Sequence, residues 1–301
     1  MTKNVNVKEI LAYLDQNKES YVFEGNQEDC VNGFSSYGNY IPGTLTWVKN
    51  YKTIEKCGNI QRITLAVVQD GVDVPAAENQ IITEESKRVF FELLEYFFTS
   101  GESIEKIGSN TYLSPEVKLG KNVTIGHNCT LDGEITIGDG TRIYNNVNII
   151  NNVMIGQNCE IQSGVMIGHD GFSYTENDEH KKQMIKHYGG VTIGDEVLIG
   201  GNCHIARGTI DNTIIKGGSK IDAVCSIAHN CKIGKNVTMI MGSRIFGSVN
   251  IEDNAYIASA LIKNQVTIGR NAIVGMGSVV IKDVKADTTV IGVPAREINK
   301  D

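Results

Sequence analysis

The sequence predicts a mainly β protein, in which a left-handed parallel β-helix follows a small N-terminal α/β domain. Three observations point to this fold class. An aliphatic residue recurs at every sixth position through most of residues 107–280, a small or β-branched residue recurs four positions after it, and residues 1–103 lack both patterns. The composition agrees, because 32 glycines, 4 prolines and only 7% aromatic residues indicate a repetitive, aliphatic core.

The six-residue repeat is unbroken in its first part. It runs through Ile107, Leu113, Leu119, Ile125, Leu131, Ile137, Ile143, Ile149, Ile155, Ile161 and Ile167. It then changes phase and returns over residues 193–205, 215–257 and 262–280. Such a period is neither helical nor strictly alternating, so we expect three hexads, about 18 residues, to form one triangular coil, with coils stacked about 4.8 Å apart. Aliphatic side chains then fill the axis, and any chemistry lies outside it.

The small inward position of the repeat also explains most of the cysteines. Five of the seven occupy it: Cys129, Cys159, Cys203, Cys225 and Cys231. We expect them to be buried as small hydrophobic residues, with no role as disulfide partners or nucleophiles.

Two breaks interrupt the repeat. Ile167 and Ile193 are 26 positions apart, two more than four hexads, and the segment between them is polar and charged. We expect residues 169–192 to leave the β-helix as an excursion loop, and long loops on rigid scaffolds often carry function. A shorter break covers the sequence ARGTIDN, residues 206–212.

Residues 1–103 have the pattern of a separate α/β domain. Helical periodicity is present in VKEILAYL and in SKRVFFELLEYFF, for which Thr83 is a candidate N-cap, while TLTWV and ITLAVV are typical of strands. We therefore predict an α/β domain over 1–103, a β-helix over 104–284 with its excursion loop at 169–192, and a C-terminal tail over 285–301.

Charge and hydropathy limit the partners and the compartment. The net charge of −7 argues against a nucleic-acid partner, because phosphate backbones are bound by cationic patches. No apolar run reaches the roughly 18 residues that a membrane-spanning helix needs, and the N-terminus has no signal-peptide pattern. We expect a cytoplasmic protein without a membrane span.

His229 is the candidate general base. It follows the inward Ile227 by two positions in SIAHN, where the side chain must leave the solenoid, and a neutral imidazole can accept a proton from an attacking amine. Gly247 lies one coil later on the same face and can offer its backbone N–H to a developing oxyanion. Asp211, one coil earlier, and Asp222 are the two candidates for a carboxylate that orients the imidazole. Each of these roles has a purely structural alternative.

Metal catalysis is disfavoured. A zinc site of the kind known in some solenoids needs histidines on neighbouring strands at short spacing, whereas His180 and His187 are seven positions apart inside the excursion loop. We expect no bound metal and no bound cofactor.

Three stretches of the chain are recognisable beyond the repeat. They are IGHDGFSY, the long VTIGDEVLIGGNCHIARGTIDNTIIKGGSKIDAVCSIAHNCKIG, and GFSSYGNYIPGTLTWVKN near the N-terminus. They resemble the UDP-3-O-acyl-glucosamine N-acyltransferases of lipid A synthesis, and the third resembles the nucleotide-binding domain of that family. The resemblance implies a homotrimer, with His229 as base and Gly247 as oxyanion donor. It also implies substrate contacts, which we assign to Trp47, Asn50, Phe172, Tyr174 and Asn230, although Trp47 is equally compatible with a place in the core.

The chain departs from that family at two places. The second active-site histidine of the family aligns with Gln265, and the C-terminal sequence GMGSVVIKDVKADTTVIGVPAREI resembles acetyl-CoA-dependent sugar acetyltransferases. That second resemblance implies that Lys282, Lys285 and Arg296 meet the phosphates of coenzyme A. With Gly247 and Gln265 from the first resemblance, we assign Gly247, Gln265, Lys282 and Arg296 to the acyl donor.

The sequence therefore favours an N-acyltransferase that moves an acyl group from acetyl- or acyl-CoA to the amine of a nucleotide-linked amino sugar. The alternative is the UDP-3-O-(3-hydroxyacyl)glucosamine N-acyltransferase of lipid A synthesis, which uses acyl carrier protein. Two further classes remain open: a non-catalytic solenoid that serves as a binding module, and a metal-dependent hydrolyase or carbonic anhydrase.

Overall fold

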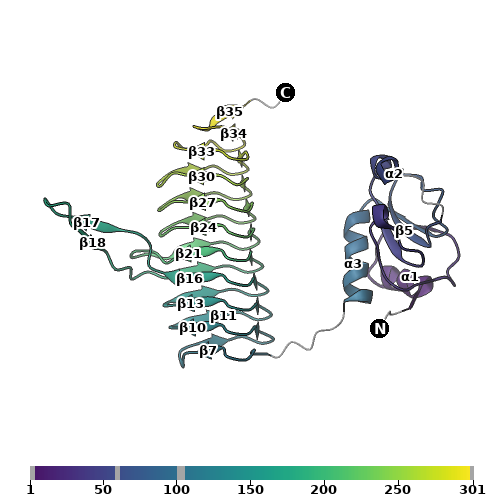
Figure 1. The fold of residues 1–301 in the computed structure, drawn as a ribbon, viewed down its shortest axis with the longest axis horizontal. Helices are drawn as coiled ribbons and strands as arrows, with labels where there is room; N and C mark the ends of the chain where they lie inside the picture. The colour runs from purple at the N-terminus through teal and green to yellow at the C-terminus, as the bar shows by residue number, and fades with distance from the viewer. Residues whose placement is uncertain (1–3, 58–61, 100–105, 299–301) are drawn as a thin grey trace. The chain divides into compact units, whose positions relative to one another are not determined.

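The computed structural model describes residues 4–57, 62–99 and 106–298, which fall into two compact units, Met1–Ser103 and Ile104–Asp301. The second unit is a stack of coils with a hairpin projecting from its side (Figure 1).

The second unit is a parallel β-solenoid whose coils form three sheets over the described residues. One sheet contains β7 (Tyr112–Leu113), β10 (Thr130–Asp132), β13 (Asn148–Ile150), β16 (Met166–His169), β21 (His204–Ala206), β24 (Ser226–Ile227), β27 (Arg244–Ile245), β30 (Leu261–Ile262) and β33 (Val279–Val280). The next contains β8 (Lys118–Leu119), β11 (Ile135–Ile137), β14 (Val153–Ile155), β19 (Val191–Ile193), β22 (Thr213–Ile215), β25 (Lys232–Ile233), β28 (Asn250–Ile251) and β31 (Thr267–Ile268). The last contains β9 (Thr124–Ile125), β12 (Arg142–Ile143), β15 (Glu160–Ile161), β20 (Leu198–Ile199), β23 (Lys220–Ile221), β26 (Thr238–Met239), β29 (Tyr256–Ile257), β32 (Ile273–Val274), β34 (Thr289–Ile291) and β35 (Arg296–Ile298).

The strand register follows the period seen in the sequence. Ile227 pairs with Ile245, 18 residues later, in the regular part of the solenoid. The coil that contains the short break is longer, since Ile205 pairs with Ile227. Because β-pairing is in register along each sheet, a residue's place on the surface is set by its number within the coil.

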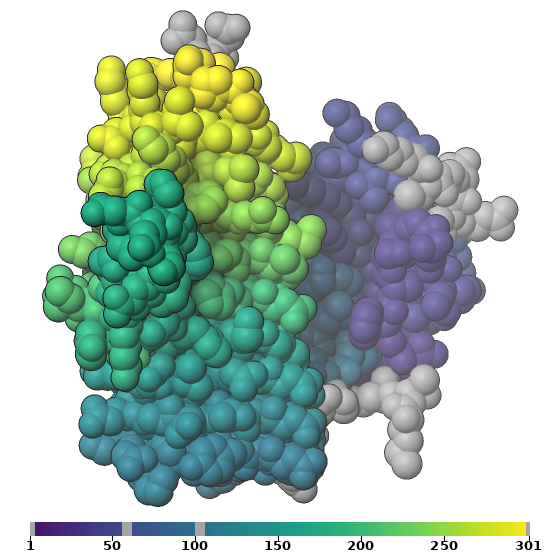
Figure 2. Space-filling model, turned by 60° about the vertical axis from the view of Figure 1, so that its left-hand side comes forward, coloured from purple at the N-terminus to yellow at the C-terminus, as the bar shows by residue number. Residues whose placement is uncertain are grey.

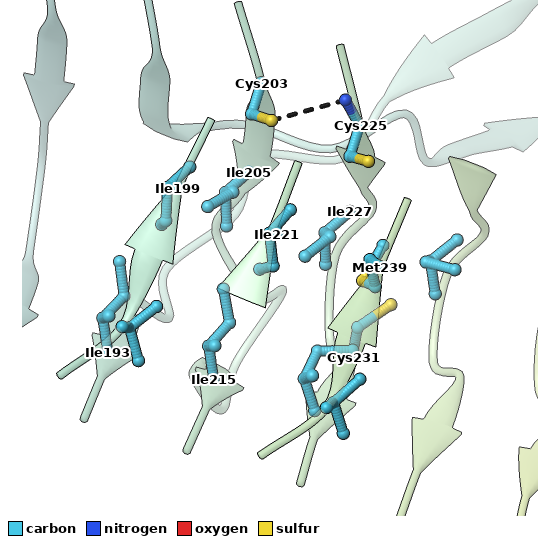
Figure 3. Close-up of a cluster of buried hydrophobic side chains, with 14 of the residues drawn as sticks. Ile193, Ile199, Cys203, Ile205, Ile215, Ile221, Cys225, Ile227, Cys231 and Met239 are labelled. Carbon is cyan, nitrogen blue, oxygen red and sulfur yellow. Dashed lines mark hydrogen bonds between the residues drawn. The ribbon is translucent and has the colours of Figure 1, made fainter. Parts of the chain in front are cut away.

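The interior of the solenoid is filled by the repeating aliphatic residues, all of them nearly or fully buried from Ile125 onward. The isoleucines of successive coils point into one common core (Figure 3). The five predicted inward cysteines are buried, which confirms their predicted place in the core, and their thiols are free. The Cys225 N–H donates to Cys203 Sγ at 3.3 Å, and burial raises the pKa of Cys231 to about 12, so that this thiol stays protonated.

The excursion loop is an antiparallel hairpin of β17 (Tyr174–Glu176) and β18 (Lys182–Met184), inserted between β16 and β19. It forms the teal projection on the surface of the coils in Figure 2. The tail also has structure: β34 extends its sheet in parallel with β32, and β35 folds back antiparallel on β34.

The first unit has a four-stranded sheet in the order β2 (Val22–Glu24), β6 (Gln80–Thr83), β5 (Leu65–Gln69) and β4 (Leu45–Val48), counted over its described residues. A second ladder pairs β1 (Val5–Asn6) with β3 (Cys30–Val31). The helices are α1 (Val7–Gln16), α2 (Tyr51–Cys57) and α3 (Ser86–Phe98), with a 3-10 turn at Tyr37–Asn39.

One detail of the first unit differs from the prediction. Helix α3 begins at Ser86 with Glu85 as its N-cap residue, so Thr83 is not the cap. The Thr83 side chain lies two positions too early and accepts a hydrogen bond from the Glu85 N–H at 3.3 Å.

Candidate active site

A column of left-handed residues forms one corner of the solenoid. Asn230, Ser248 and Gln265 occupy it in successive coils, with φ values of 62°, 60° and 63°. Asparagine tolerates this conformation better than most residues. His229 is the last residue before that corner, two positions after the inward Ile227, and is therefore carried to the outside of the coil.

Gly247 lies directly against the imidazole of His229. The Ser248 N–H donates to the His229 carbonyl at 2.9 Å, which fixes the two coils in register. A Cβ placed on Gly247 would lie only 2.8 Å from His229 Cε1 and Nε2, so the Nε2 edge of the ring faces this glycine. Among the residues that the structure describes, no acceptor is bonded to the Gly247 N–H. The stacking that the coil length predicts is thus present.

The environment of His229 favours its neutral form. The pKa of His229 is lowered from 6.5, first because burial disfavours the imidazolium and second because of the charge of His187. A neutral imidazole at pH 7 is the state that accepts a proton.

Neither carboxylate predicted as an orienting group bonds to His229. Asp222 uses its side chain to accept the N–H groups of Ala223 and Met241, and Asp211 is exposed. The Nδ1 atom of His229 is buried without a hydrogen-bond partner in the described part of the chain. The sequence placed Asp211 by coil number and offered Asp222 as the alternative, but the 206–212 break and the corner turns direct their carboxylates elsewhere.

His187 is the residue near the site that the sequence did not identify. It lies three residues after β18, in the segment that leads from the hairpin to β19; it is fully buried, and its ring centroid is 5.3 Å from that of His229 at an interplanar angle of 80°. Gly171, at the start of the hairpin, lies beside both rings: a Cβ there would be 2.7 Å from His229 Cδ2 and 2.9 Å from His187 Nε2. No repeat covers residues 169–192, so residue number alone could not place His187.

Asn230 holds the short break in place. Its Oδ1 accepts the Thr209 N–H at 2.6 Å, and its own N–H donates to Thr213 Oγ1 at 3.0 Å. Asn230 also lines an open cavity of about 460 Å³, together with Asp211, Asn212, Lys232, Ser248, Val249 and Asn250. Asn230 and Ser248 directly follow His229 and Gly247 in the sequence, so this cavity is a candidate binding site for the acceptor substrate.

The two aromatic residues predicted as substrate contacts lie on the hairpin. Phe172 is 76% exposed and Tyr174 is 40% exposed, with ring centroids 5.6 Å apart. The Lys182 ammonium lies 5.5 Å from the Tyr174 ring centroid. Such exposure leaves both rings accessible to a ligand.

Trp47 and Asn50 belong to the first unit. The half-buried Trp47 donates its indole N–H to Ser86 Oγ at 3.0 Å, and its ring stacks near that of Phe90. Asn50 precedes α2, where its side chain accepts the Thr53 N–H at 3.1 Å. Both side chains thus have structural contacts, and their contact with a nucleotide stays a prediction.

The predicted donor-binding residues differ in their surroundings. Gln265 is exposed and donates its backbone N–H to the Gly247 carbonyl at 3.0 Å, one coil beyond the glycine. Lys282 and Arg296 are exposed, and Arg296 Nη1 donates to the Ala295 carbonyl at 3.0 Å. Only Gln265 is therefore placed beside the His229 and Gly247 pair by an observed contact.

The described ranges 4–57, 62–99 and 106–298 hold no group of three or more His, Cys, Asp or Glu side chains arranged to bind a metal ion. Their helices are too short or too polar to cross a bilayer.

Comparison with known proteins finds the same repeat and fold. The family model described as bacterial transferase hexapeptide (six repeats) matches residues 134–169, and that of the hexapeptide repeat of succinyl-transferase matches residues 116–151 and 190–223. The solved structure of LpxA from Acinetobacter baumannii covers 64% of this chain and 74% of its own, with a TM-score of 0.60 and 25% identity. The solenoid is thus a left-handed parallel β-helix.

Curated relatives share part of the solenoid sequence. UDP-3-O-acylglucosamine N-acyltransferase from Campylobacter jejuni is 37% identical over 83 residues, which are 28% of this chain and 26% of that protein. The enzyme of the same name from Campylobacter lari is 33% identical over 132 residues, 43% of this chain and 41% of that protein. The chain spans less than half the length of these relatives, and it resembles hexapeptide-repeat acyltransferases.

Proposed function

We propose that this chain is an N-acyltransferase, which moves an acyl group from a thioester to the amine of a nucleotide-linked amino sugar. The observation that carries the proposal is the contact of the His229 Nε2 edge with Gly247, whose N–H has no bonded acceptor among the described residues. The names of the relatives, which specify an amino sugar linked to UDP, support the acceptor class.

In the proposed reaction the neutral amine attacks the thioester carbonyl carbon. The new C–N bond forms as the carbonyl oxygen becomes an oxyanion, which the Gly247 N–H stabilises. His229 Nε2 takes the proton from the amine nitrogen, since the lowered pKa of His229 keeps the ring neutral. The oxyanion then collapses, the C–S bond breaks, and the imidazolium returns its proton to the leaving thiolate. The products are an amide and a free thiol.

The two acyl donors predicted from the sequence, coenzyme A and acyl carrier protein, differ in their support. The relatives favour the UDP-3-O-acylglucosamine alternative over the CoA-dependent activity that the sequence put first. The resemblance to that family implies acyl carrier protein as donor, while the case for CoA rests on the exposed Lys282 and Arg296. We therefore put the lipid A type of activity first.

The first unit has the nucleotide-binding role in this proposal, with Trp47 and Asn50 as contacts. The chain has a single tryptophan, so the tryptophan emission reports on Trp47 alone. We expect UDP to quench that emission if uracil stacks on the exposed part of the indole. Unchanged emission at saturating UDP-sugar would rule out this contact.

The acyl-transfer proposal is tested by mixing the purified chain with UDP-linked amino sugars and either hydroxyacyl carrier protein or acyl-CoA, and following the released thiol. We expect release with at least one donor, and a loss of about 10²- to 10⁴-fold in His229→Ala. The matched control is His127→Ala, an exposed histidine that also precedes a left-handed asparagine, Asn128.

A non-catalytic binding module predicts the opposite result, with no thiol released from any pair and nothing lost in His229→Ala. The homotrimer implied by the resemblance is a separate part of the proposal. It predicts a solution mass near three times 32.9 kDa by light scattering, and a monomer mass would contradict it.

A further inference from the structure

His187 is held in one tautomer by a backbone carbonyl of its own segment, two residues earlier. Its Nδ1 lies 3.0 Å from the Ile185 carbonyl oxygen, and a carbonyl can only accept a hydrogen bond. In the neutral ring the hydrogen is therefore on Nδ1, and Nε2 is left with its lone pair. That Nε2 atom is buried and has no hydrogen-bond partner in the described ranges. It lies close to His229 Cδ2, since a Cβ on Gly171 would be within 3 Å of both atoms.

The backbone around His187 is fastened to the solenoid on both sides. The His187 N–H donates to Asp170 Oδ2 at 3.3 Å, and the Tyr188 N–H donates to the Thr209 carbonyl at 2.8 Å. Arg207, which is also buried, donates its Nε–H to the Gly189 carbonyl at 2.6 Å. The segment that follows the hairpin is thus fixed over the coil that precedes His229.

The charged groups around His229 come from several elements. Asp170 at the start of the hairpin and Arg207 after β21 face each other at 3.9 Å, and Asp211 lies exposed in the 206–212 break. None of these groups is hydrogen-bonded to His229, whose Nδ1 is buried. His187 is the titratable side chain whose ring packs on the imidazole of His229.

We propose that His187 is a positioning residue for His229: its buried ring excludes water from the inner side of the His229 imidazole and keeps the Nε2 edge against Gly247. The role as a partner of a catalytic base rests on the proposed function. The physical reason is that a ring at this position replaces solvent that would otherwise stabilise the imidazolium. Gly171 completes the arrangement, because any side chain there would separate the two rings.

Burial is also the leading cause of the lowered pKa of His229. If His187 supplies part of that burial, removing its ring must let water reach His229, whereas replacing it with another ring must not. This difference separates a positioning role from a simple contribution to stability.

The test measures the pKa of His229 directly, by NMR of the full chain with ¹³C-labelled histidine, with the signal assigned by its loss in His229→Ala. We expect His187→Ala to raise this pKa by about one unit. We expect His187→Phe, which keeps a ring at the site, to raise it by less than half as much. Gly171→Ala, which forces the rings apart, provides a second variant if His187→Ala does not fold, and should also raise the pKa.

An unchanged pKa in His187→Ala or Gly171→Ala would overturn the proposal, as would an equal rise in His187→Phe and His187→Ala. The NMR titration needs no substrate, so it is independent of the proposed function. A pKa that responds as expected in a chain that transfers no acyl group would refute the acyl transfer and leave the positioning role in place. In an active chain, the acid limb of the kcat profile should move with the NMR pKa.

Discussion

Gly247→Ala is the substitution that most directly tests the site, because the added methyl group meets the imidazole of His229. The Cβ would lie 2.8 Å from His229 Cε1 and Nε2, whereas ordinary contact begins at 3.4 Å. The ring must therefore move by roughly 0.6 Å or rotate away, and misplacing a catalytic group by about 1 Å costs about 10²-fold in rate. Gly247 has no left-handed φ, so the backbone itself accepts alanine.

We expect kcat for thiol release to fall by about 10²-fold in Gly247→Ala, with little change in the melting temperature. The melting temperature should change little because the added methyl group clashes with the His229 side chain, which can move, and not with the backbone. Gly33→Ala is the matched control, since its Cβ would lie 3.9 Å from the nearest atom, Thr44 Cγ2. Circular dichroism measures the fold and a thiol-reactive dye measures the rate. A folded Gly247→Ala chain with the wild-type kcat would refute the placement of His229 as the base.

Three further predictions follow from the same geometry. Protonation inactivates the base, and the pKa of the half-buried His229 is lowered, so the acid limb of the kcat profile should be centred below pH 6.5. An acid limb centred above pH 6.5 would contradict that direction. Asn230→Gly keeps the left-handed backbone but removes the acceptor of the Thr209 N–H, so the free energy of unfolding in urea should fall by about 1–3 kcal/mol. The control is Asn122→Gly, where little loss is expected because Asn122 has a positive φ but no side-chain hydrogen bond in the described ranges. Phe172→Ala should raise the KM for the amino sugar. It should change the free energy of unfolding by no more than about 0.5 kcal/mol, since the ring is 76% exposed. An unchanged KM would show that Phe172 is not part of the acceptor site.

The six-residue period by itself determined most of the solenoid. Each inward isoleucine and cysteine was identified by its number, and the contact of His229 with Gly247 followed from the length of one coil. Position in a β-solenoid is a simple function of residue number, because every coil pairs in register with the next. The same regularity located both breaks in the repeat.

Only the tertiary structure decided what lies on the inner side of His229. His187 reaches it because the segment after the projecting hairpin returns to the coils and is bonded to them, and no local pattern encodes that return. Asp211 was placed near it by counting and Asp222 was the alternative, yet their carboxylates are directed by the turns that hold them. Trp47 likewise depends on how α3 packs on β4, since its indole partner, Ser86, is 39 residues away in the sequence. Contacts between segments without a shared period are set by packing alone, and packing is a property of the folded chain.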